Sequence, residues 1–551
     1  MGLFRHAASG LTLLMVTTLA VAQGPITSGG VADTLRRSTE VKPLPTLQSL
    51  VDQPPAATPA VPSATEKTIT VDRFEFVGNR LYPAETLAAL LTDYSKRPIT
   101  LLQLYEAADK ITAFYVGQGY TLASTTVPAQ KVTEGSVRFE VLEGQIGKLR
   151  YENLNSYKPG TLDRYLGTLE GSIYRGAQFE QALRTVDVLP GLDVKARLQP
   201  GEAYGSSDLI VQATEHRLEG SVSIDNAGTD SIGVFRYAGQ LSINNPLRYA
   251  DQLSLFALRS RSHLGFKGKD GLLNYGSVSY SLPTGMGRSR LNASYGHAEF
   301  DVQGAFAGVG GKNQNAKLDL VSPMLQSTVD QLSLVAGISH TRANTDFSGT
   351  TFAESKVTVL EAGGRYAHTY PSRATSQLAL LVGTNIGSTD AAGIDEQPVK
   401  IDLDVQHLMP LPYQFQILAR TNLVYSTAVL ADTQKFALGG PDSVRGYAPS
   451  EARGDWGGLA QLTLRRSVAF GALVLTPKAF FDAGVTRQHD LQRFPPGSQP
   501  QELTLTSAGA GFDVAFHKLS FKLDYAAPLS KAPVSDGKED GRAYGMFSIA
   551  F

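Results

Sequence analysis

The sequence contains no cysteine among its 551 residues. This absence excludes disulfide bonds, zinc sites with cysteine ligands and thiol chemistry. It is typical of a chain that crosses an oxidising compartment, where free thiols would pair wrongly.

An excess of charge of either sign is also missing. The 50 Lys and Arg residues nearly balance the 51 Asp and Glu residues, which leaves a formal net charge of -1. A surface of one sign that would recruit nucleic acid or acidic substrates is therefore not expected. We predict no nucleic-acid partner.

Motifs of the common enzyme classes are absent too. The nine histidines are scattered, with no H-E-x-x-H pair and no second histidine at metal-ligand spacing. There is no G-x-S-x-G elbow, and the glycine clusters at 308–311 and 509–511 match neither a P-loop nor a dinucleotide fingerprint. We predict no catalytic residue, metal site or cofactor, and assign these glycines to strand curvature and turns.

Long apolar runs are confined to the start of the chain. Arg5 precedes the apolar run at 11–20, which ends in the small-residue pattern Ala20-Val21-Ala22. This is the pattern of a cleaved signal peptide, so we predict residues 1–22 as one and expect export from the cytoplasm. No later segment approaches the roughly 18 to 20 consecutive apolar residues of a membrane-spanning helix. If the mature chain lies in a membrane, it does so as a β-barrel.

Residues 23–67 are polar and rich in proline. Such a composition predicts a linker, because it cannot bury a core. Within it, residues 31–41 have no proline and carry mostly polar side chains. They fit a short polar helix and a disordered tail equally well.

Residues 68–215 have the pattern of a soluble α/β protein, with one order of elements present twice. That order is strand, helix, helix, strand, strand, first over 68–145 and again over 146–215. The expected strands are 68–76, 120–127, 137–142, 146–151, 194–198 and 209–213, and the expected helices are 83–91, 100–116, 162–166 and 177–188. Thr100 and Gln103 form a predicted capping box. Two tandem modules of this size suggest binding units.

From residue 216 to the end, apolar and polar residues alternate, as in Leu519, Phe521, Leu523 and Tyr525. A soluble β-sandwich also alternates, but this length would be unusual for one. At about 20 residues per strand and connection, the segment predicts a transmembrane antiparallel β-barrel of about 16 strands. Its apolar face would contact the lipids of the outer membrane and its polar face a wet lumen.

The last strand of this barrel has a recognisable end. Phe547, Ile549 and Phe551 alternate up to the final residue. Soluble domains usually fray at this point. A terminal aromatic residue on an amphipathic strand is instead the kind of signal that barrel-assembly machinery recognises, so we predict that role for these three residues.

Two further clusters stand out within the barrel segment. The first is the glycine-rich connection 436–456, which contains Val444, Arg445, Gly446 and Tyr447. The second is Phe480, Asp482 and Gly484, which share one face of an otherwise apolar strand. Since the other face would contact lipid, we expect Asp482 to face the lumen.

Together these motifs resemble those of two-partner secretion transporters of the haemolysin-activator type, a branch of the superfamily of barrels with POTRA modules. The matching segments include FVGN (76–79), YVGQGY (115–120), VPAQ (127–130), DNAG (225–228), NNPL (244–247), VRGY (444–447) and FxDxG (480–484). The resemblance covers nearly the whole mature chain. One departure is QLTLRRSV (461–468), which lacks the acidic residue expected near the start of its strand.

The resemblance implies a site inside the barrel. The loop with VRGY would fold back into the lumen, where Arg445 would meet Asp482 on the wall. A guanidinium can bond a carboxylate at two points, which fixes its orientation. The alternative is that Arg445 is a solvated loop cation and that Asp482 has water partners. The resemblance also implies that residues 31–41 form a helix that plugs the pore.

The function implied is translocation of one large unfolded exoprotein, of the adhesin or haemolysin class, from the periplasm to the cell surface. Residues 68–215 would capture its N-terminal domain, by adding a cargo strand to an open sheet edge. An insertase for other outer-membrane proteins and a passive porin remain open. The presence of only two modules argues against the insertase, and the inward loop argues against the porin.

Overall fold

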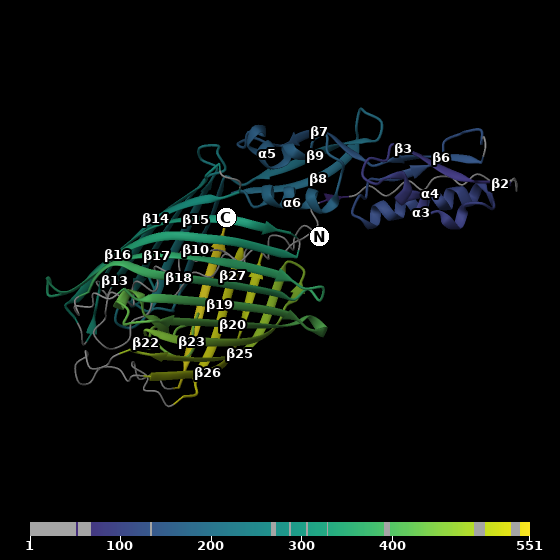
Figure 1. Ribbon diagram of the computed structural model, residues 1–551. Coiled ribbons are helices and arrows are strands. Elements are labelled where there is room, and N and C mark those ends of the chain that lie inside the picture. The colour runs from purple at the N-terminus through teal and green to yellow at the C-terminus, as the bar shows by residue number, and fades with distance from the viewer. Residues whose placement is uncertain are drawn as a thin grey trace. The chain divides into compact units, whose positions relative to one another are not determined.

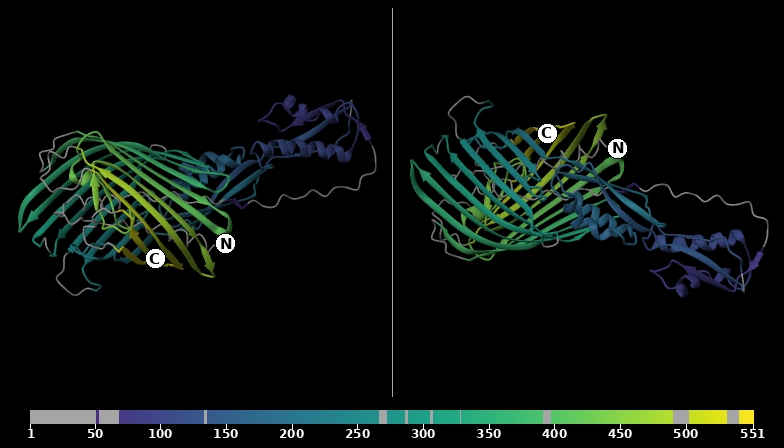
Figure 2. Two further views of the ribbon diagram at one scale, coloured as in Figure 1. Left: turned by 90° about the horizontal axis from the view of Figure 1, so that it is seen from below. Right: turned by 90° about the horizontal axis from the view of Figure 1, so that it is seen from above.

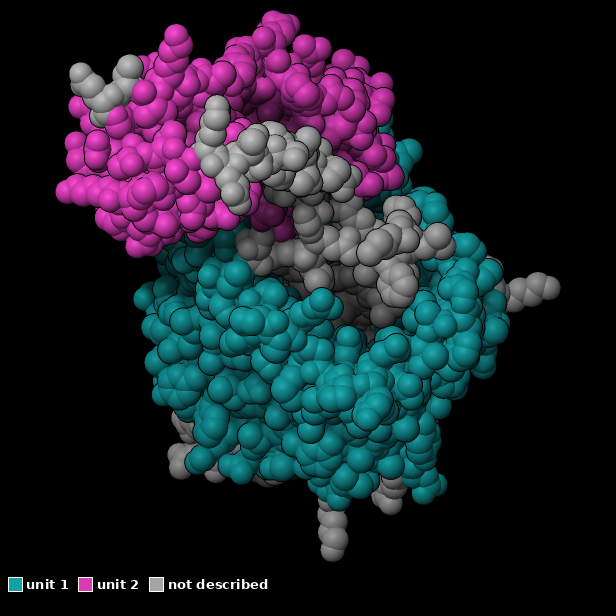
Figure 3. Space-filling view, turned by 90° about the vertical axis from the view of Figure 1, so that its right-hand side faces the viewer, with its two compact units in different colours: residues 1–46, 217–247, 251–551 teal, residues 47–216, 248–250 magenta. Residues whose placement is uncertain are grey.

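The computed structural model describes residues 51–52, 68–132, 135–265, 272–285, 288–304, 307–327, 329–390, 397–489, 502–530 and 540–551 (Figure 1). They belong to two compact units, divided after His216. Residues 248–250 belong to the unit formed by the residues before this division (Figure 3, magenta). The predicted signal peptide and the segment 31–41 lie outside the described residues. None of the described helices is long and apolar enough to cross a membrane.

The first module is a three-stranded sheet covered by two helices. Its elements are β2 (Thr68–Thr70), β3 (Arg73–Val77), α3 (Ala84–Ala89), β4 (Pro98–Thr100), α4 (Leu101–Gly117), β5 (Ser124–Thr126) and β6 (Ser136–Leu142). Strand β6 pairs with β3 in parallel and with β5 in antiparallel orientation. The core between helices and sheet includes Leu87, Ile111 and Phe139. The predicted capping box is confirmed, because Thr100 and Gln103 each accept the other's backbone N–H.

Two strand predictions in this module need correction. The single strand expected at 68–76 is two strands in different sheets, since β2 pairs with β4 and β3 with β6. The chain turns between them because the N–H groups of Asp72 and Arg73 both donate to the carbonyl of Gly135. The strand expected at 120–127 shortens to β5, because the N–H of Tyr120 still bonds the end of α4 at Tyr115.

The second module repeats this plan. Its elements are β7 (Gln145–Glu152), α5 (Pro159–Leu166), α6 (Gly176–Asp187), β8 (Leu192–Pro200) and β9 (Ser206–Glu215). Strand β9 pairs with β7 in parallel and with β8 in antiparallel orientation. A short strand from the predicted linker, β1 (Val51–Asp52), lies parallel to β8 on the other side. The sheet order is therefore β1-β8-β9-β7.

In both modules, a carboxylate at the end of the last strand or directly after it accepts hydrogen bonds from the loop after the first strand. We call this arrangement the carboxylate clasp. In module 1, Glu143 Oε1 accepts from the N–H groups of Arg80 and Leu81, both at 2.7 Å, and from the Tyr115 hydroxyl at 3.0 Å. Burial and the Glu143 charge raise the pKa of Tyr115, so its hydroxyl keeps its proton and donates. In module 2, Glu215 accepts from three consecutive N–H groups, those of residues 155–157. The same device at equivalent positions supports a structural repeat.

The strands after His216, apart from two short ones within a loop, close into one antiparallel barrel in sequence order. They are β10 (Leu218–Asp225), β11 (Phe235–Asn244), β12 (Gln252–Arg261), β13 (Leu272–Pro283), β14 (Arg290–Asp301), β15 (Val309–Gln326), β16 (Asp330–Phe347), β17 (Thr350–Thr369), β18 (Thr375–Asp390), β19 (Val399–Pro410), β20 (Phe415–Ser426), β23 (Trp456–Arg466), β24 (Val468–Phe470), β25 (Leu473–Arg487), β26 (Glu502–Phe516), β27 (Leu519–Pro528) and β28 (Arg542–Ala550). Because β23 and β24 both pair with β25, they count as one interrupted strand, and the described barrel has 16. The predicted fold class is confirmed. Figure 2 shows the barrel from two further sides.

The two faces of the wall differ as expected for a membrane barrel. On the outer face, Leu462, Phe481 and Tyr525 are about half exposed. Their neighbours on the inner face include Asp482 and Asp524, which are fully buried. Exposed apolar side chains outside and polar ones inside fit a wall between lipid and a polar lumen.

Candidate functional site

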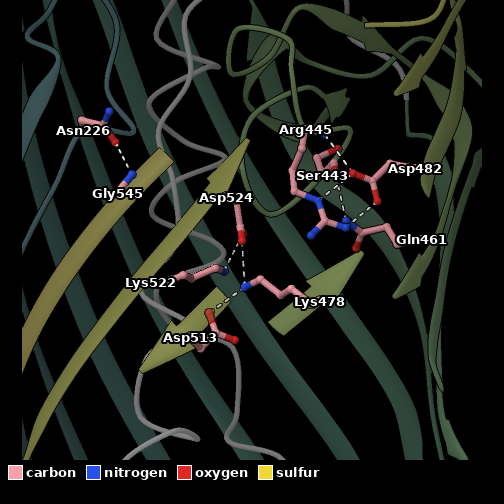
Figure 4. Close-up of polar contacts among 10 residues, drawn as sticks. All are labelled: Asn226, Ser443, Arg445, Gln461, Lys478, Asp482, Asp513, Lys522, Asp524 and Gly545. Carbon is pink, nitrogen blue, oxygen red and sulfur yellow. Dashed lines mark hydrogen bonds and ion pairs between the residues drawn. The ribbon is translucent and has the colours of Figure 1, made fainter. Parts of the chain in front are cut away.

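The connection between β20 and β23 folds into the barrel. Its two short strands, β21 (Phe436–Leu438) and β22 (Ala452–Gly454), pair with each other. The residues between them, which include the VRGY motif, are mostly buried. Since the loop touches several wall strands from the inside, it lies in the lumen, as Figure 4 shows for Arg445.

Apolar packing holds the base of this loop against the wall. Phe436, Leu438 and Val444 belong to one buried cluster with wall residues of β20, β23 and β26. Two wall glycines make room for them. A Cβ on Gly457 would lie 2.7 Å from the ring of Phe436, and a Cβ on Gly484 would lie 2.7 Å from Leu438. Because Gly484 of the FxDxG motif has no side chain, it leaves the space into which Leu438 packs.

The tip of the loop is fixed by Arg445 and Asp482. The Arg445 Nε and Nη2 atoms donate to the two carboxylate oxygens of Asp482, each at 2.7 Å. The backbone N–H of Arg445 donates to the same carboxylate at 3.1 Å. The two side chains are 7% and 0% exposed. The structure thus places both residues in the bidentate arrangement that the resemblance implied, and excludes the solvated alternative for this conformation.

Phe480 lies beneath this ion pair. The Arg445 guanidinium carbon is 3.4 Å from the centre of the Phe480 ring, within cation–π range. A Cβ on Gly509 of β26 would meet the same ring at 2.5 Å. Gly509, predicted only to help strand curvature, therefore provides space for Phe480.

Gly446 and Tyr447 attach the loop tip to the last strands of the barrel. Gly446 has a φ of +92°, which favours glycine. Its N–H donates to the Tyr544 hydroxyl at 3.1 Å, and that hydroxyl donates to the Tyr447 carbonyl at 3.0 Å. Arg542 also donates to the Gly446 carbonyl, at 3.2 Å. The Tyr447 hydroxyl donates to the Thr506 carbonyl at 3.0 Å. Each residue of VRGY thus has a separate contact.

Gln461, the first residue of the segment in which an acidic residue was expected, lies in the middle of β23, opposite Asp482. Its Nε2 donates to the Ser443 carbonyl in the loop at 2.8 Å. A carboxylate could not donate this bond. The departure from the family pattern replaces a possible ion pair with a neutral hydrogen bond to the same loop.

A second charge cluster lies on the same wall and was missed in the sequence. Lys478 Nζ lies 2.6 Å from Asp513 and 2.9 Å from Asp524, on the two following strands (Figure 4). A Cβ on Gly511 would meet the Asp524 carboxylate at 2.1 Å, so this glycine also provides space. Alternation alone places Lys478 on the face of Asp482, but its partners depend on strand register.

The DNAG motif joins β10 to both neighbouring strands. Asp225 bonds buried Arg236 of β11 at 2.7 Å. On the other side, Asn226 accepts from the N–H of Gly545 at 2.7 Å and donates to the carbonyl of Ala543 at 3.0 Å. The Asn226 side chain thus continues the ladder between the first and last strands (Figure 4).

The predicted assembly signal lies at this closure. Phe547 and Ile549 are 41% and 37% exposed on the outer face, and they pair with Ile224 and Val222 of β10. The N–H of Phe551 donates to the Gly220 carbonyl at 2.9 Å. All three residues are therefore ordered in the closing strand or directly after it. Among the described residues, no cluster of three or more His, Asp or Glu is arranged to hold a metal ion.

Comparison with protein families gives two matches. A model described as haemolysin secretion/activation protein ShlB/FhaC/HecB matches residues 205–514. A POTRA domain model of the ShlB type matches residues 69–144. The second module, at 146–215, repeats the order of elements of the first. It also repeats the carboxylate that accepts hydrogen bonds from the loop after the first strand.

Individual relatives agree with the family match. The heme/hemopexin transporter protein HuxB of Haemophilus influenzae (strain 86-028NP) is 24% identical over 86% of this chain and 84% of its own length. The hemolysin transporter protein ShlB of Serratia marcescens is 24% identical over 79% of this chain and 78% of its own. Among solved structures, CdiB from Escherichia coli has a TM-score of 0.70 and 21% identity, covering 90% of this chain and 93% of that one.

The resemblance predicted from the sequence motifs is confirmed, and the insertase and porin alternatives are not favoured. Since the first model covers more than half of the chain, the protein belongs to the ShlB/FhaC/HecB family of haemolysin secretion and activation proteins, transporters of the outer membrane with POTRA modules in the periplasm.

Proposed function

We propose that this transporter moves one large, unfolded exoprotein, of the adhesin or haemolysin class, through its barrel. The two α/β modules bind the N-terminal part of the cargo in the periplasm. The lumen then conducts the extended chain to the surface. We assign it no catalytic role.

The observation that carries this proposal is the set of polar contacts between the VRGY loop and the inner wall of the barrel. Arg445, Gly446 and Tyr447 are attached to β25, β26 and β28 by an ion pair and by hydrogen bonds, in addition to their packing against the wall. Hydrogen bonds and ion pairs of this kind can be broken and formed again with other polar groups while the barrel stays folded. A purely apolar contact does not select a specific new partner in this way. The loop is thus suited to a second position during transport.

The charges of the lumen also suit an extended polypeptide. Several lumen-facing charges form pairs, as in Arg420–Asp404 at 2.9 Å between the neighbouring strands β20 and β19, and Lys317–Glu361 at 2.6 Å between β15 and β17, with β16 between them. Paired charges leave no strong field of one sign. A chain with mixed side chains would therefore meet no selective electrostatic barrier.

Three further roles belong to this proposal. Residues 31–41 act as a plug that leaves the pore. Phe547, Ile549 and Phe551 are recognised by the barrel-assembly machinery, and the outer face contacts the lipids of the outer membrane. The division into 1–22, 23–67, 68–145, 146–215 and 216–551 assigns these roles to separate parts of the chain.

Proteomics of the culture supernatant and cell surface, with and without the gene, tests the proposal. We expect one large exoprotein to be lost while other outer-membrane proteins keep their levels. A general fall in outer-membrane proteins would instead indicate an insertase. An unchanged set of secreted proteins would contradict the proposal.

A further inference from the structure

The sheet of module 2 has one long edge with little cover. Strand β8 has nine residues and pairs with β9 over its whole length, without a bulge. On its other side, β1 pairs only with Ala196–Arg197. Figure 1 shows β7, β9 and β8 in this order across the sheet.

The other described edges of the two modules are shorter or partly covered. In module 1, β3 has five residues and β5 has three. In module 2, β7 is covered near its start, where Ile146 exchanges backbone hydrogen bonds with Gly171 and Ser172. The edge of β8 is therefore the longest open template for a further strand in this part of the structure.

The side chains of β8 suit pairing with an extended segment. Leu192, Val194, Ala196 and Leu198 alternate into the core. The residues between them point to the other face, and the only proline is the last residue of the strand. An edge without an internal proline or bulge pairs readily with other chains. In the periplasm it would be exposed to every unfolded protein in transit.

We propose that Val51–Asp52 is a guard strand, which occupies the β8 edge until an extended segment of the exported polypeptide replaces it. This inference rests on the proposed function and adds to it the place where cargo docks. The register of β1, with Val51 opposite Ala196 and Asp52 opposite Arg197, puts the guard in the middle of the edge. An incoming strand cannot pair along all of β8 while the guard remains.

The guard would select among incoming segments by length. It covers two of the nine β8 residues, and parallel pairing is the slightly weaker kind. A segment that pairs along most of β8 makes more backbone hydrogen bonds and displaces it. The guard belongs to the same chain, however, so its effective concentration is on the order of millimolar. Segments that pair over only a few residues therefore lose the competition.

A disulfide lock tests this directly, because the natural chain has no cysteine. The variant V51C/A196C would join the guard to β8 at directly opposite positions. We expect secretion of the exoprotein to fall to background when the disulfide forms and to return on reduction. The matched control K195C/Q212C joins β8 to β9, which are already paired, and leaves the edge unchanged. Its oxidation should not affect secretion.

Removing the guard gives the opposite test. The variant V51P/D52P removes both backbone N–H groups, and A56P/A57P places the same change outside the guard. The purified N-terminal domain of the exoprotein should bind the first variant several-fold more tightly than the wild type, and the second variant equally well. Wild-type secretion by the V51C/A196C protein in its oxidised form, or unchanged binding by V51P/D52P, would overturn the guard. Neither result would affect the proposed function, which fails only if the unmodified protein secretes no exoprotein.

Discussion

At the scale of single residues, glycine has a specific role in this site. Gly457, Gly484 and Gly509 each leave the space that a loop or wall side chain fills. The three named residues of the FxDxG motif therefore lie on one face of β25, and each makes a different contact with the loop. Phe480 lies under the guanidinium, Asp482 pairs with it, and Gly484 admits Leu438.

The substitution G484A tests this role. A Cβ there would lie 2.7 Å from Leu438 and 3.1 Å from the Gly458 carbonyl. Overpacking of this kind costs about 1–3 kcal/mol, and we expect the loop to shift. Limited proteolysis of the intact barrel should then cut the loop faster. The control G387A has open space around its new Cβ, and equal cleavage of the two variants would contradict the account.

The Glu215 clasp predicts a pH dependence in module 2. Burial raises the pKa of Glu215, but hydrogen bonds from Ser156, Tyr157 and Asn155 outweigh burial and lower it below 4.5. A carboxylate with a lowered pKa stabilises the fold above its unfolded-state pKa, and this contribution is lost as pH falls through the folded-state value.

Hydrogen exchange of the full-length protein can measure this effect. The amides of Ser156 and Tyr157 should lose protection as the pH falls below 4.5. In the variant E215Q their protection should be lower at neutral pH and should change little over the same range. Wild-type pH dependence in E215Q would show that another group is responsible, and E170Q, at an exposed position, is the control.

The sequence could predict only part of these contacts. Alternation placed Asp482 on the lumen side, and the family resemblance supplied its partner Arg445. Lys478 with Asp513 and Asp524, and the role of Tyr544, were missed. Their contacts join different strands, so they depend on register, which alternation alone does not determine.

At the scale of elements, the barrel is closed by a short pairing between its first and last strands. Strands β10 and β28 pair at five positions, from Ser221 to Asp225, while β26 and β27 pair at ten. Beyond the last strand pair, Asp225–Met546, the backbone N–H of Asn226 donates to the Gly545 carbonyl, and the Asn226 carboxamide adds two hydrogen bonds. The Asn226 side chain therefore extends the short contact between the first and last strands of the barrel, although it lies beyond the end of β10.

The substitution N226A should weaken this closure. Losing two hydrogen bonds costs about 1–3 kcal/mol at roughly 0.5–1.5 kcal/mol each. The temperature at which the folded barrel unfolds in SDS, measured by electrophoretic mobility, should fall. N274A, which changes an exposed residue within β13, should have little effect. A normal unfolding temperature for N226A would contradict the assigned role.

Element prediction succeeded where the pattern was long and regular. Helix α4 began at its predicted capping box, and the strands near the end of the chain followed their alternation. The strand expected at 68–76 was wrong because the carbonyl of Gly135, a residue distant in sequence, turns the chain at Asp72. The pairing of β1 with β8 could not be predicted, because two residues carry no recognisable period.

At the scale of the whole molecule, composition and alternation were enough for the fold class. A chain without long apolar runs after its first residues, but with a continuous period of two, can enter a membrane only as a barrel. The motifs then identified the family, which the family model confirmed. Function followed from the family, since the fold alone does not determine it.

The central claim is that the Arg445–Asp482 pair holds the loop in a position that transport requires. Secretion of the exoprotein by R445A, in cells where the barrel is fully assembled, tests it most directly. We predict a fall on the order of tenfold or more, because Asp482 would remain buried without its partner. R445K should recover only part of the activity, since lysine cannot bond the carboxylate bidentately, and R445A/D482A should be no worse than R445A. Wild-type secretion by an assembled R445A barrel would contradict the claim.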